Sequence, residues 1–322
     1  MQARQTFTLR QAIVFGLVFV LLYAALVWRA ERGVRAMAPE TALQRLAAFD
    51  GGQVDWLVLG ASHALPFAFG DLPGRVAEDA GLSMLVLAEV GTGPVYADLI
   101  LQRALETLDV RRVLYVADSF ALTSRDWNEA RLSDRKLLAR TPLDPVTARL
   151  LTRRTLAGDM PLTALADYLT GFSKLNPVER FPQVGWQGAA DFDQTQRPSR
   201  HAVAARIGFL YPETPPDPDT IRRYLDAMSQ LIHRARASGA DVHVLKPPLP
   251  PAFADALPAE AEIHALLAGV LNQKGIALID ASGDVPEPGH YFDTDHLNRA
   301  GLDAFYDARL RDLLLASDRP GS

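Results

Sequence analysis

Short, mostly apolar runs recur along the chain and predict buried strands. Each run is four to seven residues long and is followed by a glycine or a charged residue. This length and these boundaries are typical of strands rather than helices. The runs lie at residues 54–59, 82–88, 112–117, 242–245 and 276–279.

Segments with helical periodicity separate these runs, at residues 42–49, 94–108, 220–238 and 259–273. Apolar strands that alternate with helices are typical of a parallel sheet covered on both faces. The pattern therefore predicts an α/β protein with a flavodoxin-like three-layer α/β/α sandwich and a mostly parallel five-stranded sheet. In such a sheet, ligands bind at the carboxyl ends of the strands.

An apolar segment precedes these elements. Residues 12–28 form 17 consecutive positions without a charge, with arginines on both sides. Ala36-Met37-Ala38 has the form of a signal-peptidase site, but Pro39 and the wide gap from the apolar segment argue against cleavage. We therefore predict a tail and transmembrane anchor over residues 1–35, with a cleaved signal peptide and a buried soluble helix as alternatives. The anchor predicts a single-pass protein of the inner (cytoplasmic) membrane, with its domain in the periplasm or otherwise outside the cytoplasm.

The remaining residues, 36–322, are predicted to form one domain. Its third and fourth strands are separated by a long, partly helical insertion at about residues 124–218. An insertion of this size at the carboxyl edge of a sheet can shape a substrate cleft, or it can be a docking or disordered segment.

Composition narrows the classes of function. The chain has 322 residues, of which 48% are hydrophobic, which suffices for a packed core. Its net charge is −5, and no long run of Lys or Arg occurs, so a nucleic-acid partner is not expected. The absence of cysteine excludes disulfides and thiolate metal ligands.

The candidate chemistry lies at the two ends of the domain. Ser62 follows the first strand in a small-residue turn, and Asp293 precedes His296 by three residues in a loop just ahead of a helix. A serine hydroxyl becomes nucleophilic when a histidine takes its proton, and the histidine needs an acceptor on its other nitrogen. Ser62, His296 and Asp293 supply these three groups.

An acyl-transfer site also needs donors for the developing oxyanion. The backbone N–H of Ser62 is one candidate, and that of Gly91 or Gly93 is the second, because glycine lets the backbone come close. Asp118, after the third strand, either caps a helix or contributes to the cleft. His63 is interpreted as structural or substrate-facing.

Three sequence blocks carry a resemblance to a known family. They are Gly60-Ala61-Ser62, Gly91-Thr92-Gly93, and Asp293-Thr294-Asp295-His296-Leu297-Asn298 with Gly301. Over about residues 54–314 the chain resembles the SGNH/GDSL hydrolase superfamily. Within it, the chain is similar to the membrane-anchored envelope branch that includes the DltD proteins and the alginate O-acetylation proteins.

The resemblance implies a cofactor-independent serine esterase or O-acetyltransferase that acts on a cell-surface polysaccharide. It also implies a membrane-bound O-acyltransferase as a partner. The chain departs from the family at one block, where Asp118-Ser119-Phe120 replaces the usual Gly-x-Asn. That Asn normally helps to bind the oxyanion, so the oxyanion hole stays incompletely specified.

Other interpretations of these residues remain open. Ser62 could simply cap a helix, and Asp295 could replace Asp293 as the partner of His296. His290, Asp293, Asp295 and His296 could form a metal site. The spacing Gly60-x-Ser62-x-Ala64 also resembles the nucleophile elbow of α/β-hydrolases, but an acid three residues from the histidine does not fit that fold.

Three functions follow from these alternatives. The first is an envelope acyl-transfer enzyme that forms an acyl-Ser62 intermediate. The second is a non-catalytic protein that binds glycan or serves as a scaffold for a membrane-bound O-acyltransferase. The third is a lipid esterase or a thioesterase.

Overall fold

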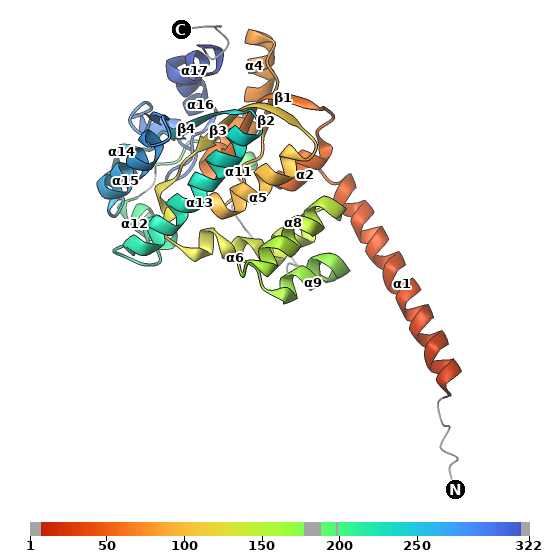
Figure 1. The fold of residues 1–322 in the computed structure, drawn as a ribbon. Coiled ribbons are helices and arrows are strands. Elements are labelled where there is room, and N and C mark those ends of the chain that lie inside the picture. Colours follow the sequence, from red (N-terminus) through yellow and green to blue (C-terminus); the bar gives the residue numbers. More distant parts are fainter. Residues whose placement is uncertain (1–7, 177–187, 198, 317–322) are drawn as a thin grey trace.

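Five parallel strands form the centre of the protein, in the order β2-β1-β3-β4-β5 (Figure 1). The computed structural model describes residues 8–176, 188–197 and 199–316. The five predicted strands are all present, and the two edge strands are shorter than predicted. The strands are β1 (Gln53–Gly60), β2 (Met84–Val86), β3 (Asp109–Val116), β4 (Asp241–Lys246) and β5 (Leu278–Asp280).

The side chains of β1 alternate between two apolar layers, as the two faces of a strand require. Leu57 and Leu59 enter one core cluster, whereas Trp56 and Val58 enter the other. Helices cover both faces, so the predicted three-layer α/β/α sandwich is confirmed. The first face carries α2 (Ala42–Ala48), α5 (Pro94–Leu105), α13 (Pro218–Ala237) and α15 (Glu260–Asn272); the second carries α3 (Pro66–Phe69), α4 (Leu72–Ala80), α16 (Arg299–Phe305) and α17 (Arg311–Ala316).

A single long helix, α1 (Leu9–Ala36), projects away from this body (Figure 1). Its most apolar 18-residue window has a mean hydropathy of 2.3 and is not buried against the rest of the protein. Its length and composition suffice to cross a membrane, which is consistent with a signal anchor or a signal sequence.

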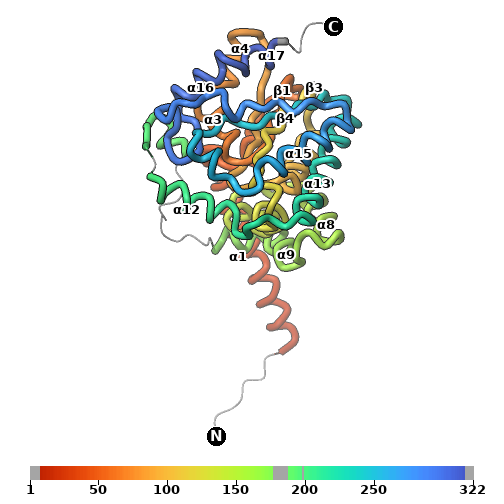
Figure 2. Tube along the Cα trace, turned by 90° about the vertical axis from the view of Figure 1, so that its left-hand side faces the viewer, coloured from red at the N-terminus to blue at the C-terminus, as the bar shows by residue number. Residues whose placement is uncertain are grey.

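The predicted insertion is largely helical where the structure describes it. One group of its helices, α8 to α10, lies at the end of the domain from which α1 projects (Figure 2). Another helix, α12, reaches the carboxyl ends of the strands, where its Arg206 donates a hydrogen bond to Asp295. The helices are α6 (Glu129–Leu132), α7 (Arg135–Arg140), α8 (Pro145–Leu156), α9 (Leu162–Thr170), α10 (Phe172–Leu175), α11 (Gly188–Asp191) and α12 (Arg200–Leu210).

The last residue of β1 must be glycine. Gly60 has φ +148°, a conformation that other residues rarely adopt. A Cβ at this position would lie 2.7 Å from the carbonyl oxygen of Val116 on the neighbouring strand. The absence of a side chain at Gly60 therefore allows β1 to pack against β3 and then turn into Ser62.

We expect Gly60→Ala to lower the free energy of unfolding by about 1–3 kcal/mol, through backbone strain and the clash with Val116. Denaturant unfolding of the purified domain measures this change. The control is Gly52→Ala, because Gly52 lies just ahead of β1 and a Cβ there meets nothing within 4 Å. Equal stability of the two variants would contradict the predicted constraint.

Candidate active site

Ser62 lies at the point where the strand order reverses. The chain passes from β1 outward to β2 and then returns across β1 to β3, so β1 and β3 are neighbours whose connections run in opposite directions. Parallel sheets bind ligands at this position. Ser62 is the first residue of the 3-10 helix η1 (Ser62–Ala64), and it is 3% exposed.

His296 and Asp293 approach Ser62 from the loop that precedes α16. Asp293 Oδ1 accepts the backbone N–H groups of Asp295, at 3.1 Å, and of His296, at 2.8 Å, which fixes the turn. Nδ1 of His296 lies 2.8 Å from Asp293 Oδ2, and its Nε2 lies 2.9 Å from Ser62 Oγ. The structure thus brings together the three residues that the sequence singles out.

Asp293 is suited to remain ionised beside His296. Burial favours its neutral form, but the charge of His296 and the hydrogen bonds that the carboxylate accepts outweigh burial. The pKa of Asp293 is therefore held below its ordinary value. An ionised Asp293 can orient the His296 ring and stabilise an imidazolium.

Asp295, the alternative partner, makes different contacts. Its Oδ1 is 3.6 Å from His296 Nδ1, farther than either oxygen of Asp293. Its carboxylate accepts hydrogen bonds from Arg206 Nε and a terminal Arg206 nitrogen, at 3.0–3.1 Å. The hydrogen-bond geometry therefore favours Asp293 as the partner of His296.

His63, next to Ser62, belongs to the same cluster. Its Nδ1 lies 2.6 Å from Asp118 Oδ1, and its Nε2 forms an ion-pair contact of 3.3 Å with Asp295 Oδ2. The His63 ring also stacks on His296 with 4.7 Å between ring centres. Burial alone would lower the pKa of His63, but Asp118 and Asp295 outweigh burial and raise it to about 10. His63 is therefore a buried cation at neutral pH.

The side chain of Asp118 joins this cluster and does not cap the helix that follows it. Asp118 precedes the 3-10 helix η2 (Ser119–Leu122), but its side chain caps none of the backbone N–H groups there. Its Oδ1 instead contacts His63. The sequence did not indicate the His63–Asp118 pair or the role of Arg206, because the partners are 55 and 89 residues apart.

The two glycines proposed as oxyanion donors differ. The N–H of Gly93 already donates to the carbonyl oxygen of Trp127 at 2.5 Å, and the Gly93 position is crowded by Asn128 and Ala121. This contact argues against Gly93 as a donor, since its N–H is already engaged. Within the described residues, the N–H of Gly91 has no such partner. Ser62, as the first residue of η1, has an N–H without an acceptor inside the helix.

The alternative metal site at His290, Asp293, Asp295 and His296 is not among the candidate ligand groups of the described residues. Nδ1 of His290 pairs with Glu287 at 3.6 Å. A different trio, His63, Asp295 and His296, can place one donor atom each within 4.8 Å of one another. Arg206 and the His63 cation already neutralise Asp295, which leaves this trio poorly suited to a cation.

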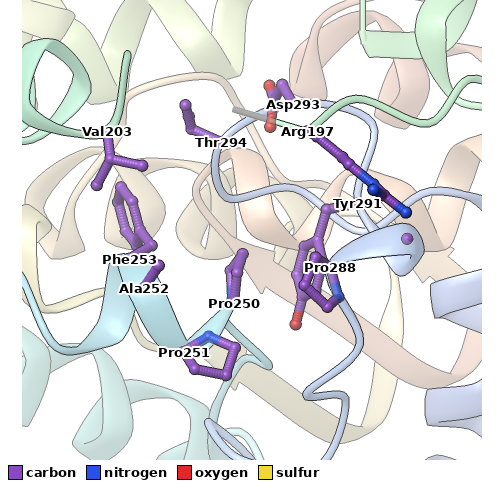
Figure 3. Close-up of a pocket in the computed structure, with 11 residues that line it drawn as sticks. Arg197, Val203, Pro250, Pro251, Ala252, Phe253, Pro288, Tyr291, Asp293 and Thr294 are labelled. Carbon is purple, nitrogen blue, oxygen red and sulfur yellow. The ribbon is translucent and has the colours of Figure 1, made fainter. Parts of the chain in front are cut away.

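A cavity of about 480 Å³ opens beside Asp293. In Figure 3, Phe253 and Val203 lie on one side of it, Pro288 and Tyr291 lie on the other, and Asp293 is at one end. Val203 belongs to α12, so the insertion forms part of the wall. The cavity is mostly apolar and has room for an acyl group or a small ligand.

Comparisons with known proteins show similarity at the level of structure. No protein-family model and no curated protein matches the sequence. A putative acylhydrolase from Bacteroides fragilis NCTC 9343 is similar with TM-score 0.45 and 10% identity, over 86% of this chain and 95% of that one. A GDSL-like lipase from Bacteroides thetaiotaomicron VPI-5482 is similar with TM-score 0.40 and 9% identity, over 90% of this chain and 98% of that one. Similarity at this level does not transfer an activity.

The His63 cation makes a prediction about stability at alkaline pH. Because its pKa is raised from 6.5 to about 10, its contribution is complete below pH 6.5 and is lost as the pH rises through about 10. We expect the free energy of unfolding of the native protein to fall between pH 7 and pH 10, and to fall less steeply in His63→Gln. Denaturant titrations at several pH values measure both slopes, and equal slopes would show that His63 is neutral in the folded state.

Proposed function

We propose that the chain is an envelope serine acyl-transfer enzyme, an esterase or O-acetyltransferase, that works through an acyl-Ser62 intermediate. The observation that carries the proposal is the continuous contact from Ser62 Oγ to His296 Nε2, and from His296 Nδ1 to Asp293. A serine, a base and an orienting carboxylate in this order are the parts that acyl transfer requires.

In the first half-reaction, His296 Nε2 takes the proton of Ser62 as Oγ attacks the carbonyl carbon of an acyl donor. Asp293 holds Nδ1–H and stabilises the imidazolium. The backbone N–H groups of Ser62 and Gly91 are the proposed donors to the oxyanion. His296 then returns the proton to the leaving group as the tetrahedral intermediate collapses to acyl-Ser62.

In the second half-reaction, an acceptor hydroxyl gives its proton to His296 and attacks the acyl-Ser62 carbonyl. The tetrahedral intermediate then breaks its bond to Ser62 Oγ, which takes the proton back from His296 as the acylated acceptor leaves. Water as acceptor makes the protein an esterase, and a sugar hydroxyl makes it an O-acetyltransferase.

We place the protein in the inner membrane as a single-pass protein with its domain outside the cytoplasm. The exposed apolar helix α1 supports a membrane anchor. The resemblance to the envelope branch of the SGNH superfamily supports a domain on the outer side of that membrane. On this proposal, the acceptor is a cell-surface polysaccharide. The acyl group comes from a membrane-bound O-acyltransferase partner.

A lipid esterase or thioesterase is the second candidate. The cavity next to Asp293 favours it, because Val203, Phe253 and three prolines give that cavity a largely apolar wall. A preference for long over short acyl chains would support this candidate.

We expect a fluorophosphonate probe to label the wild-type protein, and we expect Ser62→Ala and His296→Ala to abolish labelling. With p-nitrophenyl acetate, each variant should lose about 10⁴-fold or more in kcat, because serine and histidine act as one unit. In-gel fluorescence and steady-state kinetics measure the two losses.

The control is Ser282→Ala, which removes a serine hydroxyl bonded to Asp280 at the end of β5 and should keep full labelling. A folded wild-type protein that fails to label would contradict the proposed enzyme. It would favour the scaffold alternative.

Asp293→Asn and Asp295→Asn should separate the roles of the two carboxylates. Asp293→Asn should lower kcat by about 10⁴-fold, since the neutral amide cannot stabilise the imidazolium and its NH2 group replaces one of the two carboxylate oxygens beside His296 Nδ1. Asp295→Asn should lower the free energy of unfolding by about 3–5 kcal/mol, since it removes the buried partner of Arg206 and His63. Steady-state kinetics and denaturant unfolding of both variants test these two roles. The reverse pattern would make Asp295 the carboxylate that orients His296.

A further inference from the structure

The outward side of the helix α9 carries exposed leucines together with two exposed threonines. Ala164, Leu165 and Tyr168 are buried against the domain. On the exposed side, Leu162 is 70% exposed and Leu169 is 54% exposed, and Thr163 and Thr170 lie beside them. Large apolar side chains that gather on a surface mark a contact with protein or membrane.

No charged residue of α9 itself lies on this exposed side, and the guanidinium of Arg135 lies 5.8 Å from the centre of the Phe172 ring at its end. The one charged residue of α9, Asp167, accepts hydrogen bonds from the backbone and side chain of Ser173 and is largely buried. Ala166 lies between Leu162 and Leu169 on the same face, and Phe172, at the start of α10, is 48% exposed. We call these four residues, Leu162, Ala166, Leu169 and Phe172, the outer α9 surface.

The outer α9 surface lies at the level where the apolar part of α1 ends. Gly171, between α9 and α10, packs so closely on Val27 that a Cβ there would lie 2.9 Å from Val27 Cγ1. Val27 is one residue from the end of the uncharged run at residues 12–28. The guanidinium of Arg32 stacks over the exposed ring of Trp28 at 4.8 Å, and Trp and Arg are typical of a membrane boundary.

Polar contacts fix α1 against this part of the domain. Lys174 of α10 is nearly inaccessible, and its ammonium lies 3.0 Å from Glu31 Oε2. The same glutamate accepts the N–H of Leu143 at 3.0 Å, and Arg35 donates to the carbonyl oxygen of Leu143 at 2.7 Å. Figures 1 and 2 show α9 at the end of the domain from which α1 leaves. The domain therefore cannot pivot freely about α1 without breaking buried contacts.

We propose that the outer α9 surface lies in the headgroup and upper acyl region of the bilayer that α1 crosses. This inference rests on the membrane anchor of the proposed function and goes beyond it. A membrane whose surface lies at the level of Val27 would cover the exposed leucines. Their burial in lipid would strengthen the membrane binding that α1 provides. The domain would then have one orientation, with its active site at a fixed height above the lipid.

The cysteine-free sequence allows a direct test by single-cysteine labelling. Leu162→Cys and Leu169→Cys in the full-length protein are labelled with the fluorophore NBD and reconstituted into phosphatidylcholine vesicles. A fraction of the lipid carries a nitroxide near the headgroup, which quenches only fluorophores that reach it. Leu21→Cys, in α1, reports insertion of the anchor, and Ala77→Cys, on α4 at the far end of the domain, reports background.

We expect loss of NBD emission at positions 162 and 169 with the shallow nitroxide, and unchanged emission at 77. With a nitroxide deep in the acyl chain, we expect position 21 to be quenched more than 162 and 169. Quenching at 21 without quenching at 162 and 169 would overturn the proposed lipid contact while the anchor stands, and would assign the surface to a protein partner. Absence of quenching at 21 would overturn the anchor itself and the lipid contact with it.

Discussion

The active-site region depends on neutralising one fully buried carboxylate. Asp295 is 0% exposed, and such a charge is costly unless cations and hydrogen bonds surround it. Arg206 supplies a two-nitrogen contact, and His63 supplies a second cation. These groups come from the insertion and from the turn after β1. Pairing this charge therefore brings together three segments that are remote in sequence, and places His296, the neighbour of Asp295, against Ser62.

The insertion links the two ends of the molecule. Through α12 it contributes Arg206 to the charged cluster and Val203 to the wall of the cavity. Through α10 it contributes Lys174, which pairs with Glu31 of α1. One insertion thus contacts both the candidate active site and the candidate anchor. On the proposed function, it sets the position of acyl-Ser62 relative to the membrane from which the acyl group arrives.

The sequence was informative where structure is local and less so where it is tertiary. The strands were predictable because each is a short apolar run, and the contact between Asp293 and His296 was predictable because three residues separate them. The engagement of the Gly93 N–H by Trp127 and the pairing of Asp295 with Arg206 depend on how the insertion folds back. No spacing rule predicts which residue of such a segment reaches a given atom. The predicted domain limits of the chain stay a proposal.

The partners of the two stacked histidines decide which of them can act as a base. Both nitrogens of His63 face carboxylates, whereas His296 has one nitrogen on Asp293 and the other on Ser62. Within the cluster, His63 lies against Asp118 and Asp295, and Arg206 also pairs with Asp295.

Proton transfer from Ser62 to His296 places a positive charge beside Asp293, while the matching negative charge passes to the oxygen of the tetrahedral intermediate, so the net charge of the site does not change. The carboxylate of Asp293 already lies where the His296 imidazolium forms. It therefore stabilises the imidazolium without any reorganisation at the moment of reaction. The second histidine, His63, also has a physical role on the proposed mechanism. As a cation at neutral pH it pairs with Asp118 and Asp295 in a buried site, and Asp293 is then the carboxylate that orients His296.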